Sequence, residues 1–416
     1  MKQSVKQMFC GGKKLDLNSN ENSSVGRLLV PSLCIIYFSL FIVDMISLVF
    51  LTDVTMTFFG SSEEAFVAIT SQLVTISMVT SSIFGVLLGV LIVRFNHKKL
   101  LLMGTLCAPI GALGCSIAPN FIFLQIFYAI EGIGTMIVLV VTMVLVGELV
   151  KLNKRPQVTG WILGAPTLGT VAGSFVINIF FGTPGSWRSF LLWWALPISL
   201  IAVAAAYFVV PSTPQKQKET TGNQSFFRNF KQIFLIKSAA VCLIANTVRA
   251  VSLGWGYYYI AFLITKFSLS IGTGALAGIG FSITIGIGHF AGGYLVNRTG
   301  RKRLTVISLL IHGFTLPLIT LVPDLLIVLT ILYSGTFIGS FAMPAGLNLT
   351  LEQVPESRGT MMSVNNVLTT LAGGISTAIG GLTLTLFSYT GLFFTFAGLI
   401  IISAAIFFFV KDPCKI

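Results

Sequence analysis

Twelve apolar runs of 19 to 29 residues recur along this 416-residue chain and constrain its fold more than any other feature. Each run is long enough to cross a hydrocarbon core of about 30 Å as a helix. A backbone in lipid must form its hydrogen bonds internally, so these runs are helical. The expected spans are residues 29–52, 66–93, 100–118, 121–149, 157–181, 189–210, 238–264, 272–296, 304–322, 325–350, 358–386 and 389–410. The sequence therefore predicts an all-α membrane protein with twelve transmembrane helices.

The composition excludes a soluble globular protein of this length. Hydrophobic residues make up 55% of the chain and charged residues only 9%, too few to cover a water-facing surface. The sequence has no Walker loop, no H-E-x-x-H motif and no spacing typical of metal ligands. We therefore expect no enzyme activity, no cofactor and no metal site.

The positions of the basic residues predict the topology. If the N-terminus is inside, 23 of the 26 Lys and Arg residues fall on the cytoplasmic side, as the positive-inside rule requires. Only Arg188 and Lys266 would face outside, and Arg249 lies within a span. The net charge of +13 thus reflects topology rather than nucleic-acid binding. Both termini are expected in the cytoplasm, and the short loops favour a multi-pass protein of a cell inner membrane.

A single long polar stretch divides the chain into two halves that resemble each other. The segment GVLIVRFNHKK begins at Gly89, and GYLVNRTGRKR begins at Gly293, at the same place in the second half. GELVKLNKRPQ and LEQVPESRGT form a second such pair. Paired halves are typical of secondary transporters with a central site. The expected units are a cytoplasmic tail (1–28), a six-helix half (29–210), a linker (211–236), a second six-helix half (237–410) and a tail (411–416).

The loop that starts at Gly293 resembles the G-x-L-x-D-R-x-G-R-K loop of the major facilitator superfamily. Together with the twelve spans, the short linker and the similar segment at Gly89 in the first half, the resemblance covers nearly the whole chain. It implies two pseudo-symmetric six-helix halves and an ionic latch between them. The residues carried over to that latch are Gly89, Arg94, Lys98, Glu148, Gly293, Asn297, Arg298, Gly300, Arg301, Glu352 and Arg358.

Two departures from the family pattern weaken the expected latch. Val93 stands at the first-half acid position and Asn297 at the second. Asn297 can still form hydrogen bonds, whereas Val93 cannot. We therefore expect a less stable outward-facing state than in relatives with both acids.

Within the superfamily, the chain looks most like the twelve-spanning drug:proton antiporters. Span five carries GAPTLGTVAG, in which Pro166, Gly169 and Gly173 match the tail of the antiporter motif. The segment SWRSF, with Trp187 and Arg188, is similar to the entry of span six in those exporters. Small residues at this spacing also serve plain helix packing, so the motif favours antiport without establishing it.

Three full charges fall well within spans: Asp44, Glu131 and Arg249. Each costs about 2.5–3.5 kcal/mol to insert, so each is expected to face a partner or a water-filled cavity. The resemblance implies that spans one, four and seven line the central cavity. The family usually has an Arg where this chain has Tyr128, so Arg249 is the only buried cation left for two acids. An unmatched buried carboxylate binds protons more readily than one in water.

These residues lead to a specific functional prediction. Asp44 and Glu131 are the candidate proton-coupling residues, and the alternative for each is a static buried ion pair. The candidate substrate-binding residues are Asp44, Tyr128, Glu131, Asn246, Arg249 and Trp255. Trp255 and the following Tyr257, Tyr258 and Tyr259 are also compatible with an aromatic belt at the membrane interface.

The predicted function is proton-coupled export of small amphipathic molecules or drugs by rocker-switch alternating access. The expected partners are a small-molecule substrate, protons and the lipid bilayer, with the protein as a monomer. The alternative is a proton symporter or uniporter for one specific metabolite, because fold alone does not fix the direction of transport.

Overall fold

The computed structural model describes residues 23–150, 155–211, 235–354 and 358–412, and nearly all of them are helical. The expected linker (211–236) and both tails therefore lie largely outside the described residues. The helices are α1 (Ser23–Val43), α2 (Met45–Leu48), α3 (Leu51–Phe59), α4 (Glu64–Arg94), α5 (His97–Ser116), α6 (Phe121–Leu149), α7 (Arg155–Phe180), α8 (Trp187–Phe190), the π-helix η2 (Leu191–Ala195), α9 (Leu196–Phe208), α11 (Lys237–Ser252), the 3-10 helix η3 (Leu253–Tyr257), α12 (Tyr259–Phe267), α13 (Ile271–Thr299), α14 (Arg301–Thr315), α15 (Leu318–Leu321), α16 (Leu325–Ser340), α17 (Ala342–Leu351) and α18 (Arg358–Phe409).

These helices agree with twelve expected spans. Within the described residues, ten helices are long and apolar enough to cross a membrane. One of them, Val364–Phe409, contains two spans joined at Ser388, where the backbone has φ +57°. A further apolar helix, Gly164–Phe180, is slightly shorter. The predicted span at 121–149 coincides with α6.

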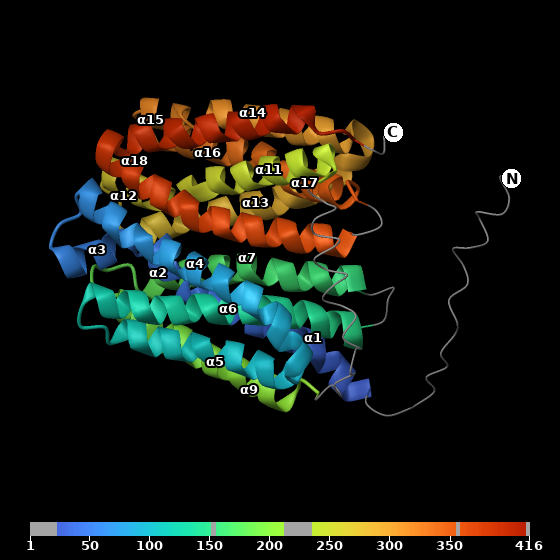
Figure 1. Ribbon diagram of the computed structural model, residues 1–416. Helices are drawn as coiled ribbons and strands as arrows, with labels where there is room; N and C mark the ends of the chain where they lie inside the picture. The colour runs from blue at the N-terminus through green and yellow to red at the C-terminus, as the bar shows by residue number, and fades with distance from the viewer. Residues whose placement is uncertain (1–22, 151–154, 212–234, 355–357, 413–416) are drawn as a thin grey trace, which may run out of the picture.

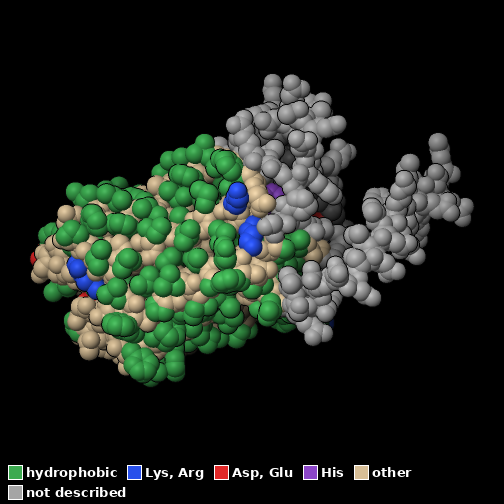
Figure 2. Space-filling model, turned by 90° about the horizontal axis from the view of Figure 1, so that it is seen from below, with side chains coloured by type: hydrophobic (Ala, Val, Ile, Leu, Met, Phe, Trp, Pro, Cys, Tyr) green, Lys and Arg blue, Asp and Glu red, His purple; other side chains and the backbone are tan. Residues whose placement is uncertain are grey.

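The helices form two groups that lie one above the other in Figure 1. We call residues 23–211 the N-terminal half and residues 235–412 the C-terminal half. Hydrophobic side chains cover most of the flank seen in Figure 2, and the few visible Lys and Arg side chains lie toward its two ends. Large apolar residues are strongly exposed there and elsewhere, for example Phe208 (80%) and Phe290 (84%). Such a surface is suited to lipid rather than water.

The first span of each half is interrupted near its middle. In the N-terminal half, α1 ends at Val43, and Asp44 separates it from the single turn of α2. In the C-terminal half, α11 passes into the 3-10 helix η3 before α12 begins. Irregular backbone at membrane depth needs protein or a cavity around it, because lipid cannot satisfy the free groups. Both interruptions are therefore candidates for a central site.

The two halves touch mainly at one end of the bundle. We call the end that carries Ser23, Arg94 and Phe409 the terminal end, and the opposite end the far end. Between α4 and α18, Thr75 and Thr377 place their hydroxyl oxygens 2.7 Å apart. A Cβ added at Gly182, at the end of α7, would lie 3.3 Å from the Cα of Gly272 in α13.

Tyr258 also forms hydrogen bonds at this contact between the halves. The hydroxyl of Tyr258 lies 2.7 Å from Ser71 Oγ in the other half and donates to the carbonyl of Thr377 at 2.8 Å. Ser71 and Thr377 lie in the far-end parts of α4 and α18, as do Ala68 and Gly381, which approach each other closely. Val79 and Gly374 approach each other near the middle of the bundle. The far end is therefore closed in this conformation.

Each of the two basic residues expected outside caps the end of a helix. Arg188 donates to the carbonyls of Ser116 (3.4 Å) and Ala118 (2.8 Å) at the end of α5. Lys266 donates to the carbonyls of Ile319 (3.1 Å), Thr320 (3.0 Å) and Val322 (2.6 Å) at the end of α15. Cations at helix C-termini satisfy free carbonyls and the helix dipole.

The cap formed by Lys266 predicts a stability effect. Lys266→Met removes a charged donor from three carbonyls, and we expect it to lower the free energy of unfolding by about 1–3 kcal/mol. The measurement is thermal unfolding of the purified protein in detergent. The matched control is Lys99→Met, because Lys99 is exposed on the terminal end. Equal midpoints for the two variants would contradict the prediction.

Candidate functional site

Asp44 lies at the break in the first span and is held by a tyrosine from α6. The hydroxyl of Tyr128 donates to Oδ1 of Asp44 at 2.9 Å and lies 2.8 Å from Ser47 Oγ. Ser47 also donates to the backbone carbonyl of Asp44 at 2.9 Å. Asp44 is half-buried although it sits at the middle of a spanning segment, whereas Tyr128 is only 1% exposed. A carboxylate at that depth is expected to face protein or an internal opening rather than lipid.

Glu131 lies one helical turn from Tyr128 but points into the N-terminal half. It is 1% exposed, and its Oε1 accepts a hydrogen bond from Thr135 at 2.7 Å. A Cβ added at Gly111 of α5 would lie 3.1 Å from the Cβ of Glu131, so the side chain is enclosed between α5 and α6. Glu131 and Asp44 are close enough for their charges to interact. The structure thus brings the two acids together without a cation between them.

Arg249 is buried in the C-terminal half without a carboxylate. Its side chain is 7% exposed, and its Nε has no hydrogen-bond partner. Within the described part of the chain, Arg249 forms no ion pair with Asp44 or Glu131. The titratable group that lies close enough to interact is His289 of α13, which is half-buried. The ion pair of Arg249 with Asp44 or Glu131 that the sequence suggests is therefore not formed between these residues in this conformation.

The other two predicted substrate contacts point into the C-terminal half. The amide nitrogen of Asn246 donates to Thr350 Oγ1 at 2.8 Å and to the carbonyl of Cys242 at 3.2 Å. Trp255 is 2% exposed and lies within an aromatic cluster, with ring centroids 5.5 Å from both Phe281 and His312. Substrate contact by these two residues stays a prediction.

The aromatic residues around Trp255 do not form an interfacial belt. Tyr258 and Tyr259 are 0% and 1% exposed, so they are packed inside the protein rather than against lipid headgroups. Tyr257 is half-buried and close enough to Asp44 for electrostatic interaction, across the boundary between the halves. The sequence allows one of these aromatic residues to line the cavity, but it does not distinguish Tyr257 from its neighbours, because hydropathy cannot tell which tyrosine faces the other half.

The small residues of span five bring α7 against the first span beside Asp44. A Cβ at Gly169 would lie 3.3 Å from the carbonyl oxygen of Phe38, and one at Gly173 would lie 3.2 Å from the side chain of Met45. Pro166 lies within α7, and its carbonyl accepts a hydrogen bond from Thr170. Helix packing thus accounts for Gly169 and Gly173 in this structure.

The predicted latch residues lie at the terminal end, on α4, α5 and α6 in the N-terminal half and on or next to α13, α14, α17 and α18 in the C-terminal half. Gly300 joins α13 to α14 with φ +84°, a conformation that favours glycine. Arg298 donates to the hydroxyl of Tyr294 at 2.6 Å, and the Nζ of Lys98 lies 5.7 Å from the ring of Tyr207. Gly89 and Gly293 lie in α4 and α13, Arg301 begins α14, and Glu352 follows α17.

Part of the latch cannot be followed in the structure. The side chains of Val93, Arg94, Glu148, Asn297 and Arg358 lie outside the described residues. The ionic latch and its expected weakness therefore stay predictions.

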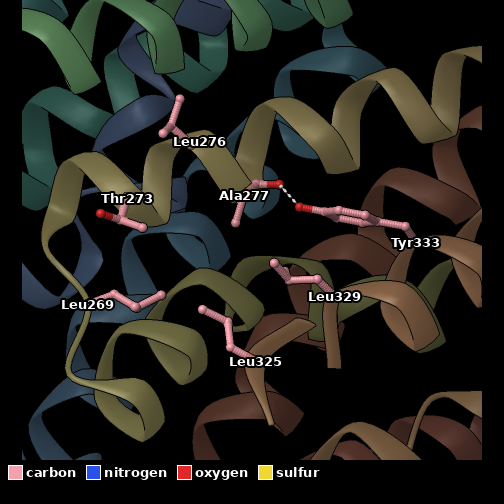
Figure 3. A pocket seen from close by; sticks show the side chains of 7 residues that line it. All are labelled: Leu269, Thr273, Leu276, Ala277, Leu325, Leu329 and Tyr333. Atoms are coloured by element: carbon pink, nitrogen blue, oxygen red, sulfur yellow. Dashed lines mark hydrogen bonds between the residues drawn. The ribbon is translucent and has the colours of Figure 1, made fainter. Parts of the chain in front are cut away.

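A separate pocket of about 190 Å³ opens at the far end of the C-terminal half. Figure 3 shows it between α13 and α16, with the hydroxyl of Tyr333 donating to the carbonyl of Ala277 at 3.0 Å. The other lining residues are Leu269, Thr273, Leu276, Leu325 and Leu329. With no titratable acid or base apart from that tyrosine, this apolar pocket is not suited to proton coupling.

Comparison with known proteins supports a transporter. The sequence model of the Major Facilitator Superfamily matches residues 33–279 and 250–415. Among curated proteins, the chain is 26% identical over 185 residues to the thioclapurine efflux transporter tcpA of Claviceps purpurea, covering 44% of this chain and 32% of that protein. It is 30% identical over 147 residues to the efflux pump hmp6 of Hypomyces subiculosus, covering 35% and 25%. The matched regions thus span about a third or less of these two relatives.

Solved structures share the fold over nearly the whole chain. A bacterial homologue of the human lysosomal transporter Spinster, inward-facing and unoccupied, has a TM-score of 0.79 at 15% identity and covers 95% of this chain and 99% of that one. A D-xylose-proton symporter has a TM-score of 0.76 at 17% identity and covers 93% and 98%. At these identities the likeness establishes the fold.

The bond between Tyr128 and Asp44 predicts energetic coupling. In a double-mutant cycle, Tyr128→Phe and Asp44→Asn should be non-additive by about 0.5–3 kcal/mol, because they share one buried hydrogen bond. The free energies come from unfolding in detergent. The control cycle pairs Tyr128→Phe with Asp53→Asn, since Asp53 accepts its hydrogen bond from Gly185 instead. Additivity in the first cycle would contradict the shared bond.

Proposed function

Because the chain belongs to the Major Facilitator Superfamily, we propose that it is a proton-coupled exporter of small amphipathic molecules. The observation that carries the proposal is the half-buried Asp44 at the break in the first span. This carboxylate has a hydroxyl donor but no cation beside it within the described residues, so it can exist with or without a proton. Competition between a proton and the substrate for Asp44 is enough to couple their transport.

The closed far end fits one state of an alternating-access cycle. The positive-inside pattern of the sequence assigns the terminal end to the cytoplasm and the far end to the outside. In this proposal the present conformation faces the cytoplasm, where deprotonated Asp44 accepts substrate. Opening of the far end then exposes Asp44 to external protons, which release the substrate.

The proton gradient supplies enough energy for this exchange. One charge that moves through 100 mV provides about 2.3 kcal/mol. At about 1.4 kcal/mol per tenfold, this drives a substrate gradient of roughly fifty-fold. Transport driven in this way does not require a catalytic domain that hydrolyses a nucleotide.

Transport of one metabolite, with symport or facilitated diffusion, is the second candidate. The chain is 28% identical over 149 residues to the putative metabolite transport protein YwtG of Bacillus subtilis, covering 36% of this chain and 32% of that protein. The efflux-pump relatives and the span-five motif favour export, so we keep export as the main proposal.

The role of Asp44 predicts a clear phenotype. In a host stripped of its own efflux pumps, the wild type should protect growth against some members of a panel of toxic amphiphiles. Asp44→Asn should reach the membrane and lose this protection, because the amide cannot carry a proton. Glu131→Gln, made in parallel, determines whether the second acid is also needed.

Two outcomes would count against the proposal. Protection by Asp44→Asn equal to that by the wild type would remove Asp44 from the coupling. If neither protein protects despite good membrane expression, broad drug export is wrong and the metabolite transporter becomes the better proposal.

The contact between the halves predicts that a cross-link at the far end stops transport. In a background without the native cysteines, we would introduce Thr75→Cys with Thr377→Cys, whose hydroxyl oxygens are 2.7 Å apart in the wild type. Sulfur atoms in place of these oxygens would be separated by a distance close to the S–S bond length of about 2.05 Å that a disulfide requires. Oxidation should abolish transport and reduction should restore it, whereas the two single-cysteine variants should be insensitive. Full transport by the cross-linked protein would contradict an opening of the far end.

A further inference from the structure

The guanidinium of Arg249 is the least compensated charge in the described residues. The side chain is more than nine-tenths buried, and its Nε is enclosed without an acceptor. An isolated cation at this depth costs about 2.5–3.5 kcal/mol. A protein usually retains such a group where something other than its own side chains binds to it.

Arg249 lies near the boundary between the halves. The neighbouring titratable group, His289, belongs to α13, which packs against α7 of the other half. Close contacts between α13 and α7 occur at Gly272, which lies beside Asn178, and at Gly286, which lies beside Thr167. His289 follows Gly286 by three residues, so it lies on the same helix face, one turn closer to the terminal end. The small remaining exposure of Arg249 is therefore consistent with an opening toward that end.

The two acids cannot neutralise Arg249 in this conformation. Tyr257, which lies near Asp44, follows Arg249 by eight residues. Eight residues correspond to about 12 Å along a helix. Glu131 is enclosed between α5 and α6 and already accepts a hydrogen bond from Thr135. The acids thus line the N-terminal half of the site, and the cation lies in the C-terminal half.

We propose that Arg249 binds an anionic group of the transported molecule, so that the substrates are zwitterions rather than simple cations. A carboxylate, sulfonate or phosphate can occupy the fork of a guanidinium with charge-assisted hydrogen bonds. In a zwitterion, the cationic group would be available to Asp44 on the opposite half. The proposal rests on the proposed transport function, whose substrate class it specifies.

The proposal makes an unusual prediction about the empty protein. Removing one partner of a buried ion pair is strongly destabilising, whereas removing an uncompensated buried charge is stabilising. Arg249→Met, which keeps an apolar side chain of similar length, should therefore raise the thermal unfolding midpoint in detergent. A midpoint lower than that of the wild type would mean that Arg249 has a structural partner, and it would overturn the proposal.

Ligand binding gives the second readout. Indole-3-acetate, tryptophan and tryptamine share one ring system and present an anion, a zwitterion and a cation. Benzenesulfonate and phenyl phosphate extend the anions. A ligand that binds the folded state raises its unfolding midpoint. We expect at least one anion or tryptophan to stabilise the wild type, with affinity about tenfold or more weaker in Arg249→Met. Tryptamine should show no difference between the two proteins.

Two further variants define the outcome. Arg249→Lys should retain part of the anion effect, and Arg303→Met, which removes an exposed cation, should retain all of it. Equal anion shifts in the wild type and Arg249→Met, or no shift with any anion, would overturn the proposal. Asp44→Asn should keep the anion shift. Loss of proton-driven transport without loss of this shift therefore separates the substrate class from the coupling mechanism.

Discussion

A backbone amide in the hydrocarbon core of a bilayer has no water to bond, and every break in a spanning helix must be covered by protein or face a cavity. The first spans of both halves break, at Asp44 and at Leu253–Tyr257. The Asp44 carbonyl accepts hydrogen bonds from the backbone of Ser47 and Leu48 and from the Ser47 hydroxyl, and the Asp44 carboxylate accepts one from Tyr128. The protein around this interruption thus also supplies the donor that a carboxylate needs at this depth. The location of the candidate site follows from that constraint.

The same need for hydrogen bonds explains the two basic residues that depart from the positive-inside pattern. Arg188 and Lys266 cap the carbonyls at the ends of α5 and α15, which belong to the third span of each half. Each charged side chain donates hydrogen bonds to carbonyls that would otherwise be free at the end of a helix. An overall charge count predicts a topology, but it cannot identify such caps, because a cap depends on a neighbour distant in sequence.

Hydropathy predicted the spans because helix length and apolar content are local properties, and α6 coincides with its predicted range. The interruptions were not predicted, since a single turn residue such as Asp44 or a change of backbone angles at Ser388 leaves hydropathy unchanged. The charges in the membrane were identified as unusual, and Asp44 was found with a hydroxyl partner. The pairing of Arg249 depends on how the two halves are placed relative to each other, which one sequence does not specify. For the same reason Trp255 was not expected inside an aromatic cluster.

The chemistry of the contact between the halves matches the energy available to open it. Two hydrogen bonds across the far end join neutral hydroxyl groups, those of Ser71 with Tyr258 and of Thr75 with Thr377. Hydrogen bonds between membrane helices average about 0.6 kcal/mol each. Breaking these two costs about 1.2 kcal/mol, which is within the energy of about 2.3 kcal/mol that one proton supplies by crossing 100 mV. A buried ion pair is harder to disrupt, because each partner would be left as an uncompensated charge. A contact made of neutral hydrogen bonds can therefore open and close in each transport cycle, and the charged side chains remain available to bind the substrate.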